Sequence, residues 1–418
     1  MIPGATPATR RAFLRLPLAA GLAGLTRHAP AAAVDLPGWV RTARAELPAT
    51  AAVAYFQSGA YGPSPAAVMA RTRELLEIQN RCPAHPENLG LLRAAEEDCR
   101  RLVARLCGAD PAEVALTANT TSGLNTVLWS FSWRPGDEVV TSDEEHPGLL
   151  VPLDVLRRRF GVVVRRVPFP ELPEAALRQV SPRTRLVALS HVSRGTGRLA
   201  PAAELAAALR ARGIPLLLDG AQGPGNVAVD FHALGCDYYS LCGHKWLLGP
   251  KGTGALLVRA GRLAEMPPSW GGSGTQASLD HYGRIEWQPD ARRFEFGTRF
   301  LAGLGGWHEA LRWLEGIGWD RIRARQAALT ARAAALVAGH RGRLELVSPA
   351  DDPARNGIVV VRLPAGHTGA ALYDRLREQD RILASPVTAP RDLRICLHFF
   401  NTEPEVDLVV ARIAAHCA

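Results

Sequence analysis

Between residues 114 and 258, short apolar segments alternate with amphipathic ones, and this alternation restricts the fold more than any other feature of the sequence. Apolar runs of about four to eight residues bounded by turn residues indicate buried strands. Strands that alternate with helices are typical of a parallel sheet covered by helices. We therefore predict an α/β domain with strands at residues 114–117, 138–141, 162–167, 185–190, 214–219, 238–241 and 254–258.

The alternation ends near residue 260, which indicates a second, smaller unit. Residues 266–300 are predicted to be rich in loops, and the last hundred residues mix short strands with helices. We expect a large domain at 34–315, beginning with an N-terminal arm at 34–65, and a small α+β domain at 316–418. Further helices are predicted at 66–79, 89–107, 147–160, 201–212, 301–315, 319–339, 368–380 and 404–416, and further strands at 343–348, 357–363 and 393–397.

The first 33 residues are predicted to be a targeting segment and not part of the fold. Arg10 and Arg11 precede an apolar run at 16–25, and Ala31-Ala32-Ala33 offers a small-residue cleavage site. The apolar run is too short to span a bilayer. We expect export of the folded protein by the twin-arginine route to the periplasm or the medium. The alternative is a disordered basic tail.

Charge and cysteine content exclude several kinds of partner. The formal net charge is +9, but four of the basic residues lie in the first 33 positions, and no basic run with interleaved aromatic residues follows. Binding to nucleic acid is therefore not expected. The seven cysteines form no CxxC pair and have no regular spacing. Neither a disulfide framework nor a bound metal is predicted.

The chain has two lysines, Lys245 and Lys251, among 49 lysines and arginines, and both lie in one segment at 237–254. Arginine stays protonated and cannot act as an amine nucleophile. A lysine kept in such a chain suggests Schiff-base chemistry with a carbonyl substrate or with pyridoxal phosphate. The alternative is a surface lysine beside a glycine turn.

Four side chains with suitable chemistry follow the ends of predicted strands: Thr121, His146, Asp219 and Lys245. Ligands of parallel α/β sheets bind beyond the carboxyl ends of the strands, so these residues are expected to share one site. Asp219 could pair with a protonated pyridine nitrogen. His146 could stack on an aromatic ring. The alternatives are helix capping by Asp219 and a capping or solvent-facing His146.

Other nearby residues suit a phosphorylated ring. Gln222 could reach a phenolate oxygen on such a ring. Thr120, Thr121 and Ser122 open a predicted helix, where free N–H groups and the helix dipole favour phosphate. An ordinary N-cap would explain one hydroxyl but not three. Ser240 and His244 flank the lysine and could bind the same phosphate.

The sequence resembles the class V aminotransferases, a branch of the fold-type I pyridoxal-phosphate enzymes, over residues 50–415. Within that class it is most similar to the isopenicillin-N-epimerase-like group. The motifs that carry the resemblance, in order along the chain, are Thr120-Thr121, His146, Ser190-His191-Val192-Ser193, Asp219-Gly220-Ala221-Gln222, Tyr238-Tyr239-Ser240, His244-Lys245-Trp246, Glu295-Phe296-Gly297-Thr298-Arg299, Arg394 and Leu397-His398-Phe399-Phe400-Asn401-Thr402.

The resemblance implies a mostly parallel seven-stranded sheet flanked by helices and a role for each motif. Lys245 is expected to form the Schiff base with pyridoxal phosphate and to move the α-proton of the substrate. Arg394 is expected to bind the α-carboxylate. The remaining implied contacts are Asp219 with the pyridinium, Gln222 with the ring oxygen, His146 on the ring face, Thr121, Ser240 and His244 on the phosphate, and Thr298 on the phosphate of a neighbouring subunit in a homodimer.

Two further residues are candidate substrate contacts, Arg194 and Ser58. Arg194 stands where many members of the class have a small polar residue or asparagine. It could be a second carboxylate clamp or only part of a loop salt bridge. Ser58 lies in a loop rich in glycine and proline at 57–65.

The resemblance implies α-proton abstraction from an amino acid or a similar substrate. Epimerase-like or lyase chemistry is our first expectation and transamination the alternative. A non-catalytic binding protein on the same fold is the alternative of another class. Cysteine desulfurases need a mobile cysteine before the carboxylate-binding arginine, and residues 382–393 contain none. Cys396 is predicted to be buried on a strand, so desulfurase chemistry is disfavoured.

Overall fold

The predicted strands of the first half form one seven-stranded sheet at the centre of the large domain. A computed structural model describes residues 36–349 and 356–418, so the signal segment predicted at 1–33 lies outside the described residues. The strand order is β2-β8-β7-β6-β5-β3-β4, and only β8 runs antiparallel to its neighbours. This confirms the predicted α/β fold. The strands are β2 (Val114–Thr117), β3 (Glu138–Ser142), β4 (Val163–Val167), β5 (Thr184–Ser190), β6 (Leu216–Asp219), β7 (Tyr238–Cys242) and β8 (Gly254–Val258).

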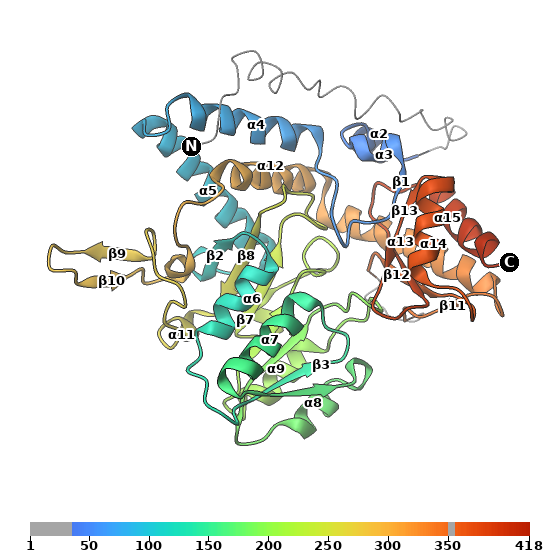
Figure 1. Ribbon diagram of the computed structural model, residues 1–418. Helices are drawn as coiled ribbons and strands as arrows, with labels where there is room; N and C mark the ends of the chain where they lie inside the picture. Colours follow the sequence, from blue (N-terminus) through green and yellow to red (C-terminus); the bar gives the residue numbers. More distant parts are fainter. Residues whose placement is uncertain (1–35, 350–355) are drawn as a thin grey trace, which may run out of the picture.

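Helices cover both faces of this sheet because its strands are apolar on both sides (Figure 1). The inner strands β5, β6, β7 and β8 are buried along almost their whole length. The helices of the large domain are α4 (Ala66–Arg81), α5 (Pro86–Cys107), α6 (Thr120–Trp129), α7 (Pro147–Phe160), α8 (Glu174–Gln179), α9 (Ala202–Arg210), α10 (Phe231–Leu234), α11 (Ala260–Leu263) and α12 (Leu301–Ile317).

The small domain is a four-stranded antiparallel sheet with helices on one side, drawn in orange and red in Figure 1. Its strand order is β11-β12-β15-β14, and its core is formed by apolar residues of β12, β15, α13 and α15. The predicted elements at 343–416 are therefore present. Their bounds are α13 (Trp319–Gly339), β11 (Glu345–Leu346), β12 (Ile358–Arg362), α14 (Gly369–Arg375), β13 (Ile382–Leu383), β14 (Ser385–Pro386), β15 (Asp392–Cys396) and α15 (Glu403–His416).

The N-terminal arm, which the sequence assigned to the large domain, packs against the small one. It contains α2 (Gly38–Ala45), α3 (Pro48–Ala52) and β1 (Ala54–Tyr55). Strand β1 pairs in parallel with β13, and Ala54 and Phe56 belong to the core of the small domain. A two-residue strand carries no periodicity, so its partner is visible only in the fold.

A second difference lies in the segment at 266–300, which was predicted to be rich in loops. It contains an antiparallel hairpin of β9 (Gln276–Leu279) and β10 (Ile285–Trp287), which projects from the large domain at the left of Figure 1. Leu279, Ile285 and Trp287 are exposed, so the hairpin has no buried face that would impose an alternating pattern.

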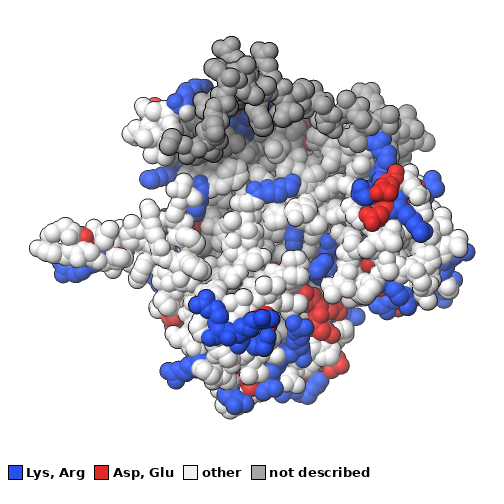
Figure 2. Space-filling model, viewed as in Figure 1, with Lys and Arg blue, Asp and Glu red and all other residues white. Residues whose placement is uncertain are grey.

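The surface carries both signs of charge. On the face drawn in Figure 2, acidic side chains are interspersed among the more numerous basic ones. Among the described residues, none of the helices combines the length and apolar character that crossing a bilayer requires.

Candidate active site

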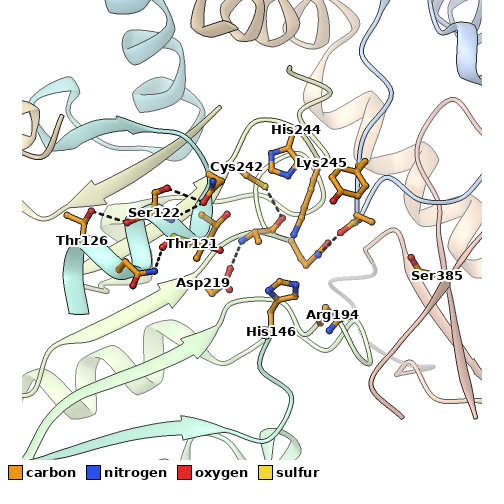
Figure 3. Close-up of a pocket in the computed structure, with 18 of the residues that line it drawn as sticks. Thr121, Ser122, Thr126, His146, Arg194, Asp219, Cys242, His244, Lys245 and Ser385 are labelled. Carbon is orange, nitrogen blue, oxygen red and sulfur yellow. Dashed lines mark hydrogen bonds between the residues drawn. The ribbon is translucent and has the colours of Figure 1, made fainter. Parts of the chain in front are cut away.

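A cavity of about 720 Å³ lies beyond the carboxyl ends of the central strands, where the sequence placed the shared site. It collects residues from the 57–65 loop, the start of α6, the ends of β6 and β7, and the small domain. Of the predicted site residues, those that line it are Thr120, Thr121, Ser122, His146, Arg194, Asp219, Gln222, His244, Lys245 and Arg394 (Figure 3).

The start of α6 forms an anion cradle at one end of the cavity. Asn119 is its N-cap, and the Asn119 side chain accepts hydrogen bonds from the backbone N–H (2.9 Å) and the hydroxyl (3.2 Å) of Ser122. The hydroxyl of Thr120 is buried and has no hydrogen-bond partner among the described residues. Asn119 was not among the predicted site residues, although asparagine before a helix is a recognisable N-cap signal.

Only one of the two lysines faces the cavity. Lys251 donates to the carbonyl of Gly62 at 3.2 Å and so ties the 57–65 loop to the lysine loop. Lys245 lies among the cavity-lining residues, and no acidic residue of the described chain lies within salt-bridge distance of it. Lys245 is therefore the candidate for the Schiff-base chemistry that the sequence predicts for a lysine amine.

Asp219 ends β6 and lies 4% exposed at the base of the cavity. Its carboxylate accepts the backbone N–H of Ala221 at 2.9 Å. Burial raises the pKa of Asp219, and the positive charge of Lys245 acts in the opposite direction. A buried carboxylate of this kind is suited to a cationic partner such as a protonated ring nitrogen.

A second buried carboxyl group lies close to Asp219. Glu145 accepts hydrogen bonds from the backbone N–H (3.0 Å) and the hydroxyl (2.6 Å) of Ser190, and from the hydroxyl of Ser142. Burial raises the pKa of Glu145 to about 7. Glu145 thereby joins the end of β5 to the segment that carries His146, and no local sequence pattern indicates this contact.

The side chain of Gln222 is fixed on both sides. Its amide nitrogen donates to the carbonyl of Gly59 at 2.8 Å, and its amide oxygen accepts the indole N–H of Trp246 at 2.8 Å. A primary amide has two N–H donors, so one remains for a ligand in the cavity. The predicted contact of Gln222 with a ring oxygen is compatible with this orientation.

Two histidines of the site are neutral near pH 7. Loss of contact with bulk water and the charges of Lys245, Arg194 and Arg394 lower the pKa of His146 to about 4. Nδ1 of His146 accepts the N–H of Gly148 at 2.8 Å, which leaves the proton on Nε2. Burial and Lys245 likewise lower the pKa of His244 to about 4, and its buried Nδ1 has no hydrogen-bond partner within residues 36–349 and 356–418.

Three predicted site residues do not line the cavity. Ser240 is fully buried and its hydroxyl donates to the carbonyl of Thr120 at 2.8 Å, so it ties the start of α6 to strand β7. Ser58 is also fully buried, and its hydroxyl has no partner among the described residues. Thr298 is exposed and lines a neighbouring cavity of about 290 Å³ that shares Ser122, Thr126 and Phe296 with the main one.

Several lining residues were not singled out by the sequence. Trp270 comes from the segment predicted to be loops, and Ser385 comes from the unpredicted strand β14, whereas Phe296 belongs to the motif at 295–299 but was given no role of its own. Isolated aromatic or serine residues in such segments carry no functional signal of their own. The other lining residues are Gly59, Ala60, Tyr61, Asn119, Asn125, Thr126, Ala221 and Cys242.

The donor set fits pyridoxal phosphate, the group that the sequence resemblance implies. The cradle at α6 offers a helix N-terminus and unpartnered polar atoms for a phosphate. Lys245 supplies an amine for an aldehyde, Asp219 a buried carboxylate for a ring nitrogen and Gln222 a free amide N–H for a ring hydroxyl. The cavity is also large enough for a ring with a substrate attached.

None of the cysteines in the described chain resembles a mobile nucleophile at this cavity. Cys82 is exposed at the end of α4 and does not line the cavity, whereas the other six are buried. Cys396 has no exposed surface on β15, as predicted. Cys242 lines the cavity, but burial raises its pKa, so the thiol is not a ready nucleophile.

Comparison with known proteins agrees with this geometry. The family model for aminotransferase class-V matches residues 54–409. The chain is 38% identical over 326 residues to an isopenicillin N epimerase of Streptomyces clavuligerus, covering 74% of this chain and 81% of that one. An isopenicillin N epimerase of Amycolatopsis lactamdurans is 34% identical, with 87% and 95% covered. A cysteine desulfurase of Dickeya dadantii is 32% identical, with 86% and 90% covered.

Solved structures resemble the chain over nearly their whole length. A cystine C–S lyase in complex with its product cysteine persulfide superposes with a TM-score of 0.82 at 26% identity, covering 88% of this chain and 99% of the lyase. A mutant of that lyase with glycine linked covalently to its pyridoxal-phosphate cofactor gives a TM-score of 0.83 at 26% identity, with 89% and 98% covered.

Proposed function

Because this chain belongs to the class-V aminotransferase family and is a pyridoxal-phosphate-dependent enzyme, we propose that it removes the α-proton of an amino acid in an epimerase-like or lyase-like reaction. One observation carries the proposal. The amine of Lys245 opens into the same cavity as the buried carboxylate of Asp219, the anion cradle of α6 and the guanidinium group of Arg394.

Each residue has a distinct task in this proposal. The start of α6 and His244 hold the phosphate, Asp219 holds the ring nitrogen, and His146 packs against the ring face as a neutral imidazole. The bound cofactor supplies an electron sink for the charge that develops at Cα. Arg394 binds the α-carboxylate of the substrate. Lys245 would hold the cofactor through its amine and would be the base that takes the α-proton of the substrate.

Two sets of relatives favour epimerase-like or lyase-like chemistry over transamination. The isopenicillin N epimerases are 34–38% identical to the chain, and a cystine C–S lyase shares its fold. Desulfurase chemistry is not proposed, because residues 382–393 lack a cysteine and the cysteines around the cavity are buried.

Proton exchange tests the proposal. The purified enzyme is incubated in deuterium oxide with L- and D-amino acids, and mass spectrometry follows deuterium at Cα. Inversion of configuration identifies an epimerase, loss of a β-substituent a lyase, and stoichiometric keto acid a transaminase. Exchange with none of the amino acids would contradict the proposal and favour a binding protein.

Two lysine variants and chemical labelling identify the lysine whose amine binds the cofactor. We expect Lys245→Ala to lower the exchange rate by about 10²- to 10⁴-fold, the usual contribution of a general base. Borohydride treatment followed by peptide mapping should place the reduced cofactor on Lys245 in the wild type. The matched variant Lys251→Ala should carry the label at the same position, because Lys251 only ties down the loop at Gly62. A label on Lys251 would contradict the assignment.

The enzyme is further proposed to be a homodimer in which Thr298 reaches the cofactor phosphate of the neighbouring subunit. Thr298 is exposed beside the main cavity, and the apolar side chains around it are also exposed. They are Trp270 (51%), Phe296 (45%) and Phe300 (42%). A second copy would remove this apolar surface from water.

Export by the twin-arginine route is also proposed, on the basis of Arg10, Arg11 and the apolar run that follows them. This route accepts folded proteins, so the cofactor could be bound before export. N-terminal sequencing of the exported protein checks the proposal, and an intact N-terminus at residue 1 or 2 would contradict cleavage near Ala33.

A further inference from the structure

We infer that the substrate carries a second carboxylate in addition to its α-carboxylate, and that Arg194 binds it. This inference rests on the proposed function, because it names the class of amino acid for the same site. It begins with two arginines that face one cavity. Arg194 comes from the loop after β5 and Arg394 from β15, and both line the cavity with Lys245.

Neither arginine has an acidic partner within the described chain. No Asp or Glu lies within salt-bridge distance of Arg194 or Arg394, whereas many other arginines of the protein are paired. The structure therefore does not support the loop salt bridge that the sequence left open for Arg194. The Nε atom of Arg394 is buried and has no hydrogen-bond partner in the described part of the chain, and Arg394 is only 3% exposed.

The loop that carries Arg194 is rigidly held. Glu144 accepts hydrogen bonds from the hydroxyls of Ser193 and Thr196, the latter at 2.7 Å. The hydroxyl of Ser193 in turn accepts the N–H groups of Gly195 and Thr196 at 3.1 Å each. Glu144 thus holds the loop through its hydroxyls and forms no ion pair with Arg194 among the described residues, and Arg194 lines the cavity.

Arg394 is linked to the same loop, since its guanidinium donates to the carbonyl of Arg194 at 3.3 Å. This contact joins the Arg394 guanidinium to the backbone of the loop that carries Arg194. Each guanidinium group can bind one carboxylate in a bidentate manner, and its planar shape limits the entropy that is lost per hydrogen bond.

The balance of charge favours two carboxylates over one. The cavity is lined by three cationic side chains, Lys245, Arg194 and Arg394, but by one acidic residue, Asp219. Lys245 is engaged by the cofactor, and the phosphate belongs to the cradle at α6. In the view of Figure 3, Thr121 and Ser122 of that cradle lie on the other side of Lys245 from Arg194.

A single α-carboxylate would leave one of the two guanidinium charges without a counter-charge in a partly buried site. Burial and the neighbouring charge of Arg394 lower the pKa of Arg194, which reports the cost of placing these like charges together. A second carboxylate removes that cost. The ligand class is therefore an amino acid with an acidic side chain or with a carboxylate on a longer substituent.

The first test is binding without chemistry. Calorimetry on the cofactor-loaded enzyme compares malonate, succinate, glutarate and adipate with monocarboxylates of the same chain lengths. We expect one dicarboxylate to bind at least about tenfold more tightly than its monocarboxylate, as a charged hydrogen-bonded contact provides. The preferred chain length then measures the span between the two guanidinium groups.

The second test uses variants and matched substrates. In Arg194→Gln, we expect KM for glutamate, aspartate or 2-aminoadipate to rise about 10- to 100-fold while KM for glutamine or asparagine stays unchanged. Arg194→Lys keeps the charge and should retain part of the preference. Arg166→Gln is the control, because Arg166 is exposed on the edge strand β4. An unchanged absorption band of the bound cofactor in the visible spectrum verifies that each variant is folded.

The outcomes separate this inference from the proposed function. Equal binding of mono- and dicarboxylates, or an equal loss for acidic and amide substrates in Arg194→Gln, would mean that both arginines serve one carboxylate and would overturn the inference alone. The inference alone would also be overturned if the enzyme exchanged the α-proton of neutral amino acids as efficiently as that of acidic ones. Absence of exchange with every amino acid would overturn the proposed function, and the dicarboxylate titration would still test Arg194.

Discussion

At the scale of single residues, Gly62 determines how closely the N-terminal loop approaches the lysine loop. The N–H of Gly62 donates to the carbonyl of His244 at 2.7 Å. A Cβ atom at this position would lie 2.0 Å from the carbonyl oxygen of Lys245 and 2.9 Å from Leu248. Backbone atoms cannot move aside as a side chain can, so only glycine permits this contact.

We expect Gly62→Ala to destabilise the protein by about 1–3 kcal/mol, the usual cost of inserting a methyl group into a packed site. The added methyl group would also push the lysine loop away from the N-terminal loop, and this displacement should weaken the binding of the cofactor. Urea unfolding and titration with pyridoxal phosphate measure the two effects.

Gly90 provides the matched control. It lies within helix α5, and a Cβ atom there would meet nothing within 4 Å. Gly90→Ala should therefore stabilise the protein by about 0.5–1 kcal/mol through the gain in helix propensity. Equal stability of the two variants would contradict the close approach at Gly62.

At the scale of elements, the segment after β15 connects the small domain to the floor of the site. His398 is fully buried between Trp246 and Phe400. Its Nδ1 accepts the N–H of Phe399 at 2.9 Å, and its Nε2 lies 3.1 Å from the carbonyl of Trp246. Since Trp246 orients Gln222, this contact extends from the small domain to the cavity.

The same contact makes stability depend on pH. Burial lowers the pKa of His398 to about 4, against 6.5 for an ordinary histidine. The unfolded chain then binds more protons than the folded one between these values, so this contribution is complete above pH 6.5 and is lost as the pH falls towards 4. The full effect is roughly 3 kcal/mol.

We therefore expect His398→Gln to be less stable than the wild type at pH 7, with a difference that shrinks by up to about 3 kcal/mol between pH 7 and pH 4. Urea unfolding at several pH values measures it. His281→Gln, at an exposed position beside the β9–β10 hairpin turn, should follow the wild type at every pH. A constant difference for His398→Gln would contradict the titration of His398.

At the scale of the whole molecule, the exposed apolar surface beside the cavity predicts the oligomeric state. Light scattering should give the wild type twice the mass of one chain. Phe300→Glu places a charge in the proposed interface and should weaken the dimer by about tenfold or more. The site would then lose the partner's Thr298, so activity should fall with the dimer.

Val163→Glu is the control for this experiment. Val163 is 40% exposed, close to the 42% of Phe300, but lies on the edge strand β4 at the far end of the central sheet. It should leave the mass and the activity unchanged. A monomeric wild type with full activity would contradict the shared site.

The sequence alone determined the order and type of most elements. The apolar runs that became β2, β3, β5, β6, β7 and β8 are buried on both faces along almost their whole length, and such strands have a clear local signature. The sequence also predicted where Lys245 and Asp219 lie. Both follow predicted strands, which placed them at one edge of the sheet. The polar start of α6, which we propose binds the phosphate, was visible as three hydroxyls at a helix start.

Only the tertiary structure decided contacts between residues far apart in the chain. The pairing of β1 with β13 and the two bonds that orient Gln222 join segments whose local sequence carries no sign of the partner. The absence of an acidic partner for Arg194 among the described residues likewise depends on where the fold places the loop after β5. The physical reason is that burial patterns are local properties of a chain, whereas hydrogen-bond partners and counter-charges depend on which segments the fold brings together.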